Sequence, residues 1–552
     1  MAVLLFAATL IETSCGDTYR PVATVAPTNA GDPSGSETEA VLQCCLDPSS
    51  VNAVTTSATS VLTAIDVSGD MNGGNKVLGF KAASAAGPVS GSVGQPIVMD
   101  YNRTIMYTAS TANDSVALTT LNSSATGFSS YNATISLPTG TKPIGLSFQY
   151  YNSSYSYMFV VNSGTSSTIC PGTGSLGIIN QSTDLLLGTV CLGSSAAPST
   201  PVDAWIFRTH GKVFVLSYNA SGSSTVYVVN TTSYKVTNTF TVGKGAVKMG
   251  QSVDGNYIYT LNNTDKTISI IDAVNEDVVG TVSTANSLSS AAPVDLALDM
   301  NYNDTTSNTQ YNHVWVLLAD GTVSVYDNTT PGSLTWVTSM STITDAQLTA
   351  GIYPTNIAML RDGTEVYVGL GNSDKIAGID TSMISQSAVT SSLALTSVTV
   401  GVHRSTSGTM TDTASATYTV AETTTPIVNF VAVSRQGTGS NNSAVLSKAY
   451  ASTVSTTVYS YYDANGNAVT SRPEADSTPT WCTDSGNTTT CANLYNGTAV
   501  VTGAANGSTP INTYVTTISS PAQVTYCTAP STDTDGQKEC PLTTPTFILG
   551  RN

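Results

Sequence analysis

The sequence predicts an all-β chain, most of which folds as a β-propeller of about seven blades, with a small disulfide-pinned, β-rich appendage at its carboxyl end. Three observations predict this fold. Short runs of alternating apolar and polar residues, typical of half-buried strands, recur along the chain. Turns rich in Asn, Asp and Gly, which tolerate positive φ, separate these runs. The strands recur in sets of four, roughly every 40 to 60 residues, as in propeller blades.

The first 15 residues are expected to direct export. Residues 1–11 read MAVLLFAATLI, an apolar run followed by small residues, as in a secretory signal. Small residues before Cys15 and Gly16 after it resemble a bacterial lipoprotein cleavage site, which makes Cys15 a candidate for lipidation. The alternatives are an ordinary cleaved signal, or an uncleaved strand used in assembly.

Three regions are expected after this segment. Residues 16–58 are rich in Pro, Ala, Ser and Thr and predict an irregular lead-in or tether. Residues 59–468 hold the repeats and predict the propeller. Residues 469–552 lose the repeat and predict the β-rich appendage, whose ending TPTFILG (544–550) is a candidate strand that packs on the propeller or on a neighbouring subunit.

The clearest repeats are DGNYIYTLNNTDKTISIIDAVNEDVVGTV (254–282) and DGTEVYVGLGNSDKIAGID (362–380). These units resemble the YVTN-type β-propeller repeat of secreted bacterial and archaeal surface proteins, and the resemblance covers residues 59–467. It implies a propeller fold and a location outside the cell. The repeat is also similar to lactonase propellers of the phosphogluconolactonase kind, a similarity of fold that assigns no activity.

Closure of the propeller is expected to use both ends of the chain. A ring with unjoined ends leaves two sheet edges exposed, and strands from both termini can cover them. We expect a composite last blade in which residues 428–434 and 449–462 come from the carboxyl side. Residues 60–80 supply its outer strands from the amino side.

The nine cysteines predict disulfides, which agree with export. Setting Cys15 aside leaves an even number. Three pairs are close in sequence and can each close a short loop, while two adjacent cysteines can bond to each other or elsewhere. The pairs are Cys170 with Cys191, Cys482 with Cys491, and Cys527 with Cys540, and the adjacent residues are Cys44 and Cys45. A metal site is the rival, but no pair has CxxC spacing and no His lies nearby, so none is predicted.

A search for catalytic chemistry finds little. The three histidines, His210, His313 and His403, fall in different predicted blades, and no GxSxG or HExxH motif is present. No cofactor is therefore expected. Aspartates recur near predicted blade starts, and we expect turn or channel-mouth roles for them in preference to catalysis. They are Asp203, Asp254, Asp295 and Asp362.

Two further motifs are ambiguous. Residues 463–467 with Glu474 at the twelfth position resemble a calcium loop, but Ala468 replaces the sixth-position Gly, which favours a plain hairpin turn. Asn-x-Ser/Thr sequons are frequent and allow glycosylation on exposed loops. The candidates are Asn102, Asn132, Asn230, Asn262, Asn328 and Asn496.

Charge excludes some partners. The formal net charge is −17, which argues against nucleic acid and against docking on anionic lipid through a basic patch. No internal apolar run reaches about 18 residues, so membrane attachment is expected only through a lipid on Cys15.

The sequence favours a non-catalytic extracellular or cell-surface module. It would act in structure or interaction, with a protein or glycan partner, and could assemble into a homo-oligomer or filament through its terminal segments. One alternative is a periplasmic lipoprotein that scaffolds a membrane complex. Another is a lactonase-like or metal-assisted hydrolase at the propeller channel.

Overall fold

A computed structural model describes most of residues 105–380, with gaps at 112, 122–127, 151–155, 208–210, 253–254, 331 and 360–364 and around two short strands between 299 and 312. Outside that range it describes separate strands between residues 39 and 99 and between 395 and 551. The described residues are nearly all β, as the sequence predicts. The predicted signal, residues 1–15, and the lead-in up to residue 38 lie outside the described residues. No described helix is long and apolar enough to cross a membrane.

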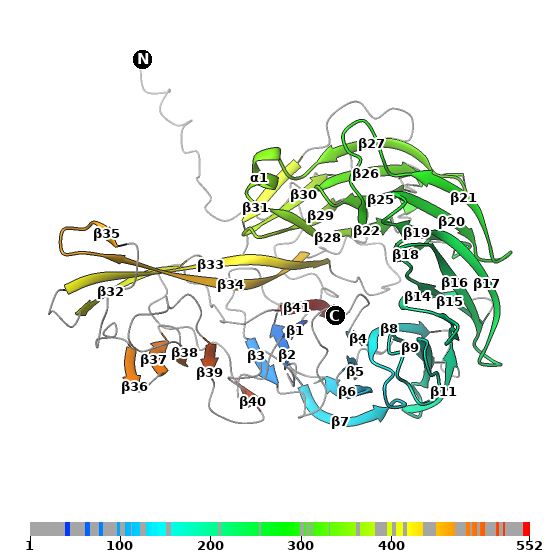
Figure 1. Ribbon diagram of the computed structural model, residues 1–552, viewed down its shortest axis with the longest axis horizontal. Coiled ribbons are helices and arrows are strands. Elements are labelled where there is room, and N and C mark those ends of the chain that lie inside the picture. The colour runs from blue at the N-terminus through cyan, green and yellow to red at the C-terminus, as the bar shows by residue number, and fades with distance from the viewer. Residues whose placement is uncertain are drawn as a thin grey trace, which may run out of the picture.

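Six four-stranded antiparallel sheets follow one another along the chain and form blades 1 to 6. In each blade the first strand is innermost and the fourth is outermost (Figure 1). Blades 1 to 3 comprise β4 (Ile97–Met99), β5 (Ile105–Ser110), β6 (Ser115–Leu121), β7 (Phe128–Ser136); β8 (Pro143–Tyr150), β9 (Ser156–Asn162), β10 (Ser175–Asn180), β11 (Leu185–Cys191); and β14 (Pro201–Phe207), β15 (Lys212–Ser217), β16 (Ser223–Asn230), β17 (Lys235–Lys244). Blades 4 to 6 comprise β18 (Ala246–Gln251), β19 (Tyr257–Asn262), β20 (Thr267–Asp272), β21 (Asp277–Ser283); β22 (Pro293–Leu298), β25 (His313–Leu318), β26 (Thr322–Asp327), β27 (Thr335–Ser341); and β28 (Tyr353–Met359), β29 (Glu365–Gly371), β30 (Lys375–Asp380), β31 (Leu395–Thr399).

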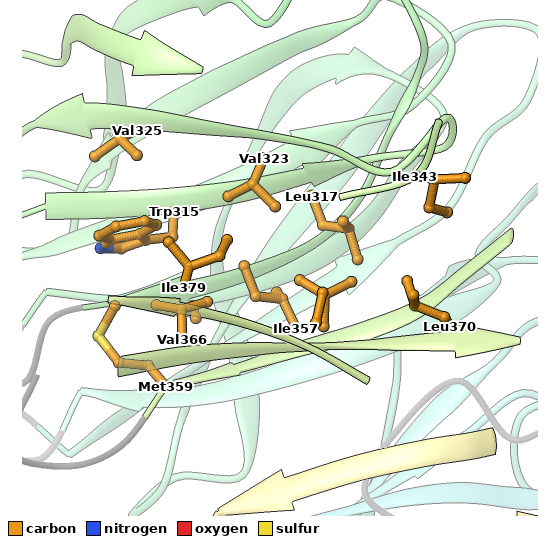
Figure 2. Close-up of a cluster of buried hydrophobic side chains, with 13 residues drawn as sticks. Trp315, Leu317, Val323, Val325, Ile343, Ile357, Met359, Val366, Leu370 and Ile379 are labelled. Carbon is orange, nitrogen blue, oxygen red and sulfur yellow. The ribbon is translucent and has the colours of Figure 1, made fainter. Parts of the chain in front are cut away.

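The core lies between blades, because each blade buries a face against the next. Trp315, Leu317 and Val325 of blade 5 face Ile357 and Val366 of blade 6 in one apolar cluster (Figure 2). Burial of such faces is the main force that holds the ring together, at about 25 cal/mol for each Å² of apolar surface. The middle strands of a blade, such as β19 and β25, are therefore buried on both faces, while burial alternates along outermost strands such as β21.

Two more sheets fill the arc between blade 6 and blade 1. The first holds a long hairpin, with strands β32 (Arg404–Thr411), β33 (Thr417–Val433), β34 (Ala449–Tyr462) and β35 (Ala468–Val469). The end of β33 near Val428 and Val431 is buried against Tyr367 and Ile376 of blade 6. Figure 1 shows the other half of the hairpin extending away from the ring.

The second sheet joins the two ends of the chain. Its order is β40 (Gln523–Val524), β3 (Val77–Phe80), β2 (Val61–Asp66), β1 (Glu39–Cys44) and β41 (Pro545–Arg551), all antiparallel. Strand β41 contacts β33, β34 and β4, and so takes the innermost position between the hairpin sheet and blade 1. The inner strands β4, β8, β14, β18, β22, β28, β33 and β41 thus follow one another around the axis.

Closure differs in part from the expectation. Strands within residues 60–80 do lie in a composite sheet, but there β3 pairs with β40, and β2 pairs with β1, which in turn pairs with β41. The expected partners, residues 428–434 and 449–462, pair with each other as β33 and β34 in a sheet of their own. The single composite blade of the sequence prediction is therefore two sheets. The candidate strand at 544–550 is a strand, and it pairs with β1 of the same chain.

Smaller elements decorate the ring. A hairpin of β12 (Gly193–Ser194) and β13 (Ala197–Pro198) follows blade 2, and helix α1 (Asp345–Thr349) precedes blade 6. Strands β23 (Asn303–Asp304) and β24 (Thr309–Gln310) form a further pair between β22 and β25. The region after residue 469 also contains a four-stranded sheet of β36 (Cys482–Ser485), β37 (Thr488–Asn493), β38 (Gly497–Thr502) and β39 (Val515–Thr517).

Candidate functional site at the propeller axis

Polar residues recur at one position of the inner strands. In three blades this position follows an x-Val pair, as Pro201-Val202-Asp203, Ala246-Val247-Lys248 and Pro293-Val294-Asp295. In each, the register with the second strand shifts between the first and third of these residues, which is a β-bulge. The bulge redirects the strand at the same place in successive blades, so these three polar side chains line one level of the axis.

The aspartates tie each blade to the next. Asp203 Oδ2 accepts a hydrogen bond of 2.9 Å from the backbone N–H of Met249, the residue after Lys248. Asp295 Oδ2 accepts one of 3.0 Å from the N–H of Ile357 in β28. The other oxygen of each carboxylate accepts the N–H of the residue that follows it, Ala204 or Leu296. Each aspartate therefore holds its own strand and the neighbouring inner strand in a fixed relation.

Asn356 makes the corresponding link from blade 6 to the hairpin sheet. Its Oδ1 accepts the N–H of Val431 at 2.9 Å, and its Nδ2 donates to the carbonyl of Val431 at 2.7 Å. Val431 therefore occupies the place in the ring that Met249 and Ile357 occupy in blades 4 and 6. This relation identifies the buried end of β33 as the inner strand of the next blade position.

Lys248 lies between the two aspartates and forms an ion pair with Asp295. The Lys248 side chain is 42% exposed and that of Asp295 is 6% exposed, so the pair is accessible from the lysine side. Burial lowers the pKa of Lys248, but the charge of Asp295, its hydrogen bond and the charge of Asp203 raise the pKa above its ordinary value overall. Lys248 is therefore a cation at neutral pH.

Asp203 has a shifted acidity. Burial raises its pKa from 3.8 to about 6, against the opposing effects of the Met249 N–H and the charge of Lys248. A carboxyl group that titrates near neutrality is one signature of functional sites, but structural pairs show it as well. Here both oxygens of Asp203 already accept backbone hydrogen bonds, which favours the structural interpretation.

The other residues singled out by the sequence do not join this cluster. Asp254, Asp362, His210 and His403 lie outside the described residues. His313 begins β25 and is buried, consistent with a structural role. Among the described residues, no group of three or more His, Cys, Asp or Glu side chains is placed to hold a metal ion.

Sequence reasoning missed Lys248 and Asn356. The signal that would have found them is the alignment of Ala246-Val247-Lys248 and Pro354-Thr355-Asn356 with the two Pro-Val-Asp motifs. The search for carboxylates passed over both, because neither residue is acidic.

One face of the propeller carries exposed apolar side chains. We call it the upper face: the side on which inner strands begin, formed by the loops from each outermost strand to the next blade and from each second strand to the third. Four exposed residues lie there, with 37% to 59% of their surface exposed: Ile169, Tyr218, Leu288 and Tyr353. Of the other large exposed apolar residues described, only Val274 lies on the opposite face, and the rest are on outermost strands.

A disulfide fixes part of the upper face. Cys170 and Cys191 are bonded, with a Cα–Cα distance of 5.3 Å, which confirms that predicted pair. It links the loop between β9 and β10, which carries Ile169, to the end of β11. Cys482 and Cys491 are opposite each other in β36 and β37, a placement compatible with their predicted bond. Cys44 is in β1, while Cys15, Cys45, Cys527 and Cys540 lie outside the described residues.

The predicted glycosylation sites fall in different environments. Asn262 and Asn328 are buried, with 0% and 2% of their surface exposed, and the Asn262 Nδ2 donates to Thr267 and Ser269. The expectation that these two lie on exposed loops is therefore wrong, because both are enclosed in the fold. Asn230 is half-buried and caps the turn after β16, and Asn132 is in β7. Asn102 and Asn496 lie outside the described residues.

Residues 463–467 form a hairpin turn. The Asp463 carboxylate accepts hydrogen bonds from the backbone of Asn465 and Asn467 and from the Asn467 side chain, and Gly466 adopts a positive φ of 81°. The turn links β34 to β35, as the hairpin interpretation predicts. Glu474, the twelfth residue of the calcium-loop interpretation, lies outside the described residues.

Known proteins give a likeness of fold only. No family model matches the chain, and no curated protein matches it. The solved structure of the Dos1 propeller is 14% identical, with a TM-score of 0.41, over 56% of this chain and 69% of that one. A 6-phosphogluconolactonase candidate of Bacteroides fragilis is 14% identical, with a TM-score of 0.42, over 67% and 97%. The Cps50 (Swd1) propeller domain of Myceliophteria thermophila is 9% identical, with a TM-score of 0.38, over 60% and 93%. At these identities and TM-scores, none of them assigns an activity to this all-β, propeller-type chain.

Proposed function

We propose that this chain is a non-catalytic, exported β-propeller that acts at the cell surface as a protein-interaction module. The observation that carries the proposal is that the polar side chains at the axis are hydrogen-bonded to the backbone of the ring. Asp203 and Asp295 each accept a backbone N–H of a neighbouring inner strand on one carboxylate oxygen and the N–H of the following residue on the other. The side-chain oxygen of Asn356 accepts the N–H of Val431. A catalytic carboxylate needs a free oxygen within reach of its substrate, and these oxygens are occupied by the ring.

The upper face supports a binding role. Single exposed apolar residues are common on proteins, but here they recur on loops next to blades 2, 3 and 5 and at the start of β28 in blade 6, all on one face. Tyr is favoured in protein interfaces, because it offers a large apolar body and a polar tip. The disulfide at Cys170 and the helix α1 order two of the loops of this face, which lowers the entropic cost of binding.

The test is a comparison of two double variants. Leu288→Ser with Tyr353→Ser removes apolar surface from the upper face, and Val274→Ser with Val279→Ser removes it elsewhere on the ring. Tagged chains are incubated with the envelope fraction of the producing cell, and bound chain is measured over a range of concentrations. The proposal expects the upper-face variant to bind at least about tenfold more weakly than the wild type, and the control variant to bind equally well. Equal binding by both variants contradicts it.

Export and anchoring belong to the same proposal. Mass spectrometry of the mature chain from the producing cell decides between its forms. An amino terminus at Cys15 with a diacylglyceryl adduct supports a lipid-anchored surface or periplasmic protein. A cleaved terminus without lipid supports a secreted protein, and an unprocessed terminus with cytoplasmic fractionation contradicts export.

A lactonase-like hydrolase is the alternative, and Asp203 is the observation that favours it. Its pKa of about 6 suits a general base, and the cation of Lys248 lies beside it. Release of acid from a panel of sugar lactones tests this alternative. Turnover by the wild type that is lost in Asp203→Asn and in Lys248→Met, with the fold retained, establishes the enzyme. No turnover above the buffer rate supports the binding proposal.

A further inference from the structure

Strand β32 is an open sheet edge. In the hairpin sheet the strand order is β32, β33, β34 and β35, so β32 pairs with β33 on one side and with no other described strand. Its eight residues pair with Thr417 to Thr424 without a register shift. A row of backbone N–H and C=O groups therefore faces outward along its other side.

The outermost strands of the blades are less suited than β32 to pairing with another strand. In blades 1 to 5 the pairing of the outermost strand contains at least one register shift, which bends and twists the edge. The sixth outermost strand, β31, is regular but only five residues long. Strand β32 is thus the one outer edge among these that is both regular and eight residues long.

The sequence of β32 adds no protection. It reads RSTSGTMT, in which Arg404 at the first position is the only charge, and it contains neither Lys nor Pro. Proteins commonly prevent edge pairing with charged residues or proline along the strand. Polar, uncharged Ser and Thr side chains instead allow a second strand to lie alongside.

The hairpin projects from the ring where β32 lies. Val428 and Val431 at the base are 1% and 0% exposed, but Thr417 and Thr419, which pair with the far end of β32, are exposed. Figure 1 shows this outer half beyond the blades. A projecting sheet of few strands has little stability by itself. Pairing with further strands would increase the stability of this half of the hairpin.

We propose that two copies of this chain pair through β32, antiparallel and about a two-fold axis perpendicular to the sheet. In such a pair, directly opposed residues must lie on the same face, so the axis passes through a single residue. Centred on Ser407, the register sets Arg404 opposite Met410 and Ser405 opposite Thr409, and no two like charges meet. The two hairpin sheets then become one continuous sheet of eight strands, and the self-complementary edge selects a second copy over an unrelated strand.

The test uses the full chain and its mass in solution, measured by analytical ultracentrifugation over a range of concentrations. The wild type is expected to be a dimer that dissociates on dilution. Substituting Ser405, Ser407 and Thr409 together by Lys places like charges opposite each other whether the axis lies at residue 407 or 408. We expect the dissociation constant to rise at least about tenfold. The matched control carries three lysines at Thr237, Thr239 and Thr241, exposed positions of the bulged edge β17, and should dimerise as the wild type does.

A charge exchange separates loss of pairing from loss of folding. A second variant carries Glu at the same three positions of β32, and an equimolar mixture with the Lys variant should restore a dimer that contains one of each. A wild-type chain that stays monomeric at every concentration overturns the inference, even if another protein binds the hairpin. So does a dimer that the Lys variant leaves intact. The result is independent of the proposed upper-face function, since Leu288→Ser with Tyr353→Ser should leave the dimer unchanged.

Discussion

Asn356 binds both backbone groups of Val431, a residue 75 positions later in the chain. The same arc of the ring shows the relation twice more, from Asp203 to Met249 and from Asp295 to Ile357. In the Asn356 case the linked strand, β33, belongs to the hairpin sheet, and the side chain is an amide that both donates to it and accepts from it. A single polar side chain thus fixes where the irregular part of the chain rejoins the regular ring.

Replacing Asn356 by Ala should weaken this junction. The variant leaves the buried N–H and C=O of Val431 without partners, which should lower the free energy of unfolding by about 2–4 kcal/mol. Chemical denaturation followed by circular dichroism measures the change. Thr239→Ala, at an exposed site of β17, is the control and should change stability by less than about 0.5 kcal/mol. Equal stability of the Asn356 variant and the control would show that the junction rests on apolar packing alone.

The titration of Asp203 should make the fold less stable as the pH rises. Its pKa is about 6 in the folded chain and 3.8 in the ordinary state, so the folded chain binds the extra proton between these values. The contribution is fully present below about pH 4 and is lost as the pH rises through 6. The difference of about two units between these pKa values corresponds to at most about 3 kcal/mol in the free energy of unfolding. Between pH 4 and 7 the free energy of unfolding should therefore fall more steeply for the wild type than for Asp203→Asn. An equal dependence on pH in both chains contradicts the raised pKa of Asp203.

Removing Lys248 should destabilise the axis through Asp295. The carboxylate of Asp295 is almost fully buried, and Lys248→Met leaves it without its counter-ion. Because the lysine side chain is partly exposed and water screens it, we expect a modest loss of about 1–2 kcal/mol. Adding Asp295→Asn removes the uncompensated charge and should recover part of the loss. A double-mutant cycle that shows no coupling contradicts the pairing.

The Cys170–Cys191 bond should stabilise the upper face. It closes a loop with a sequence separation of 21 residues, for which chain entropy gives a contribution of about 3 kcal/mol. The variant with both residues changed to Ser should unfold at a lower temperature and be cut by proteases first in the loop between β9 and β10. Thermal unfolding of the wild type and of this double variant under reducing conditions is the control. With the disulfide reduced, the wild type should unfold at the same temperature as the variant.

Glycan occupancy should follow burial. If the chain is glycosylated in the producing cell, peptide mass spectrometry should find no glycan on Asn262 or Asn328, whose side chains are enclosed. Asn230 is half-buried and its side-chain oxygen accepts from the turn, while Thr232, the third residue of its sequon, is exposed. A glycan on Asn262 in the folded chain would contradict the packing at the end of β19.

The regular blades were predictable because local pattern determines them. The runs YIYTLN and TISIID, with a polar turn between them, form β19 and β20 as predicted, but both strands are buried on both faces and not half-buried. Alternating burial is found in outermost strands such as β21. The Cys170–Cys191 bond was predictable for the same reason, since both residues belong to one blade. Within such a unit, residues that are close in sequence are also close in space, so the local pattern is enough to predict its strands.

The closure and the axis were harder to predict, because they depend on contacts between distant residues. Residues 428–462 alternate as strands, but nothing local says whether they pair with β2 or with each other. The pairing of β1 with β41 spans almost the whole chain. Likewise Asp203 was noticed as a carboxylate, but its role depends on the N–H of Met249, 46 residues away, which the sequence alone does not place.

Closure of the ring by its own carboxyl-terminal strand can be tested directly by a cysteine pair. Val41 and Leu549 are opposite each other in the register of β1 and β41. Both are replaced by Cys in the full chain, which is then oxidised, digested and mapped by mass spectrometry. We predict a disulfide between residues 41 and 549 within one chain, formed equally well at high dilution. A link that forms only between chains, or none while the fold is retained, would contradict the closed ring.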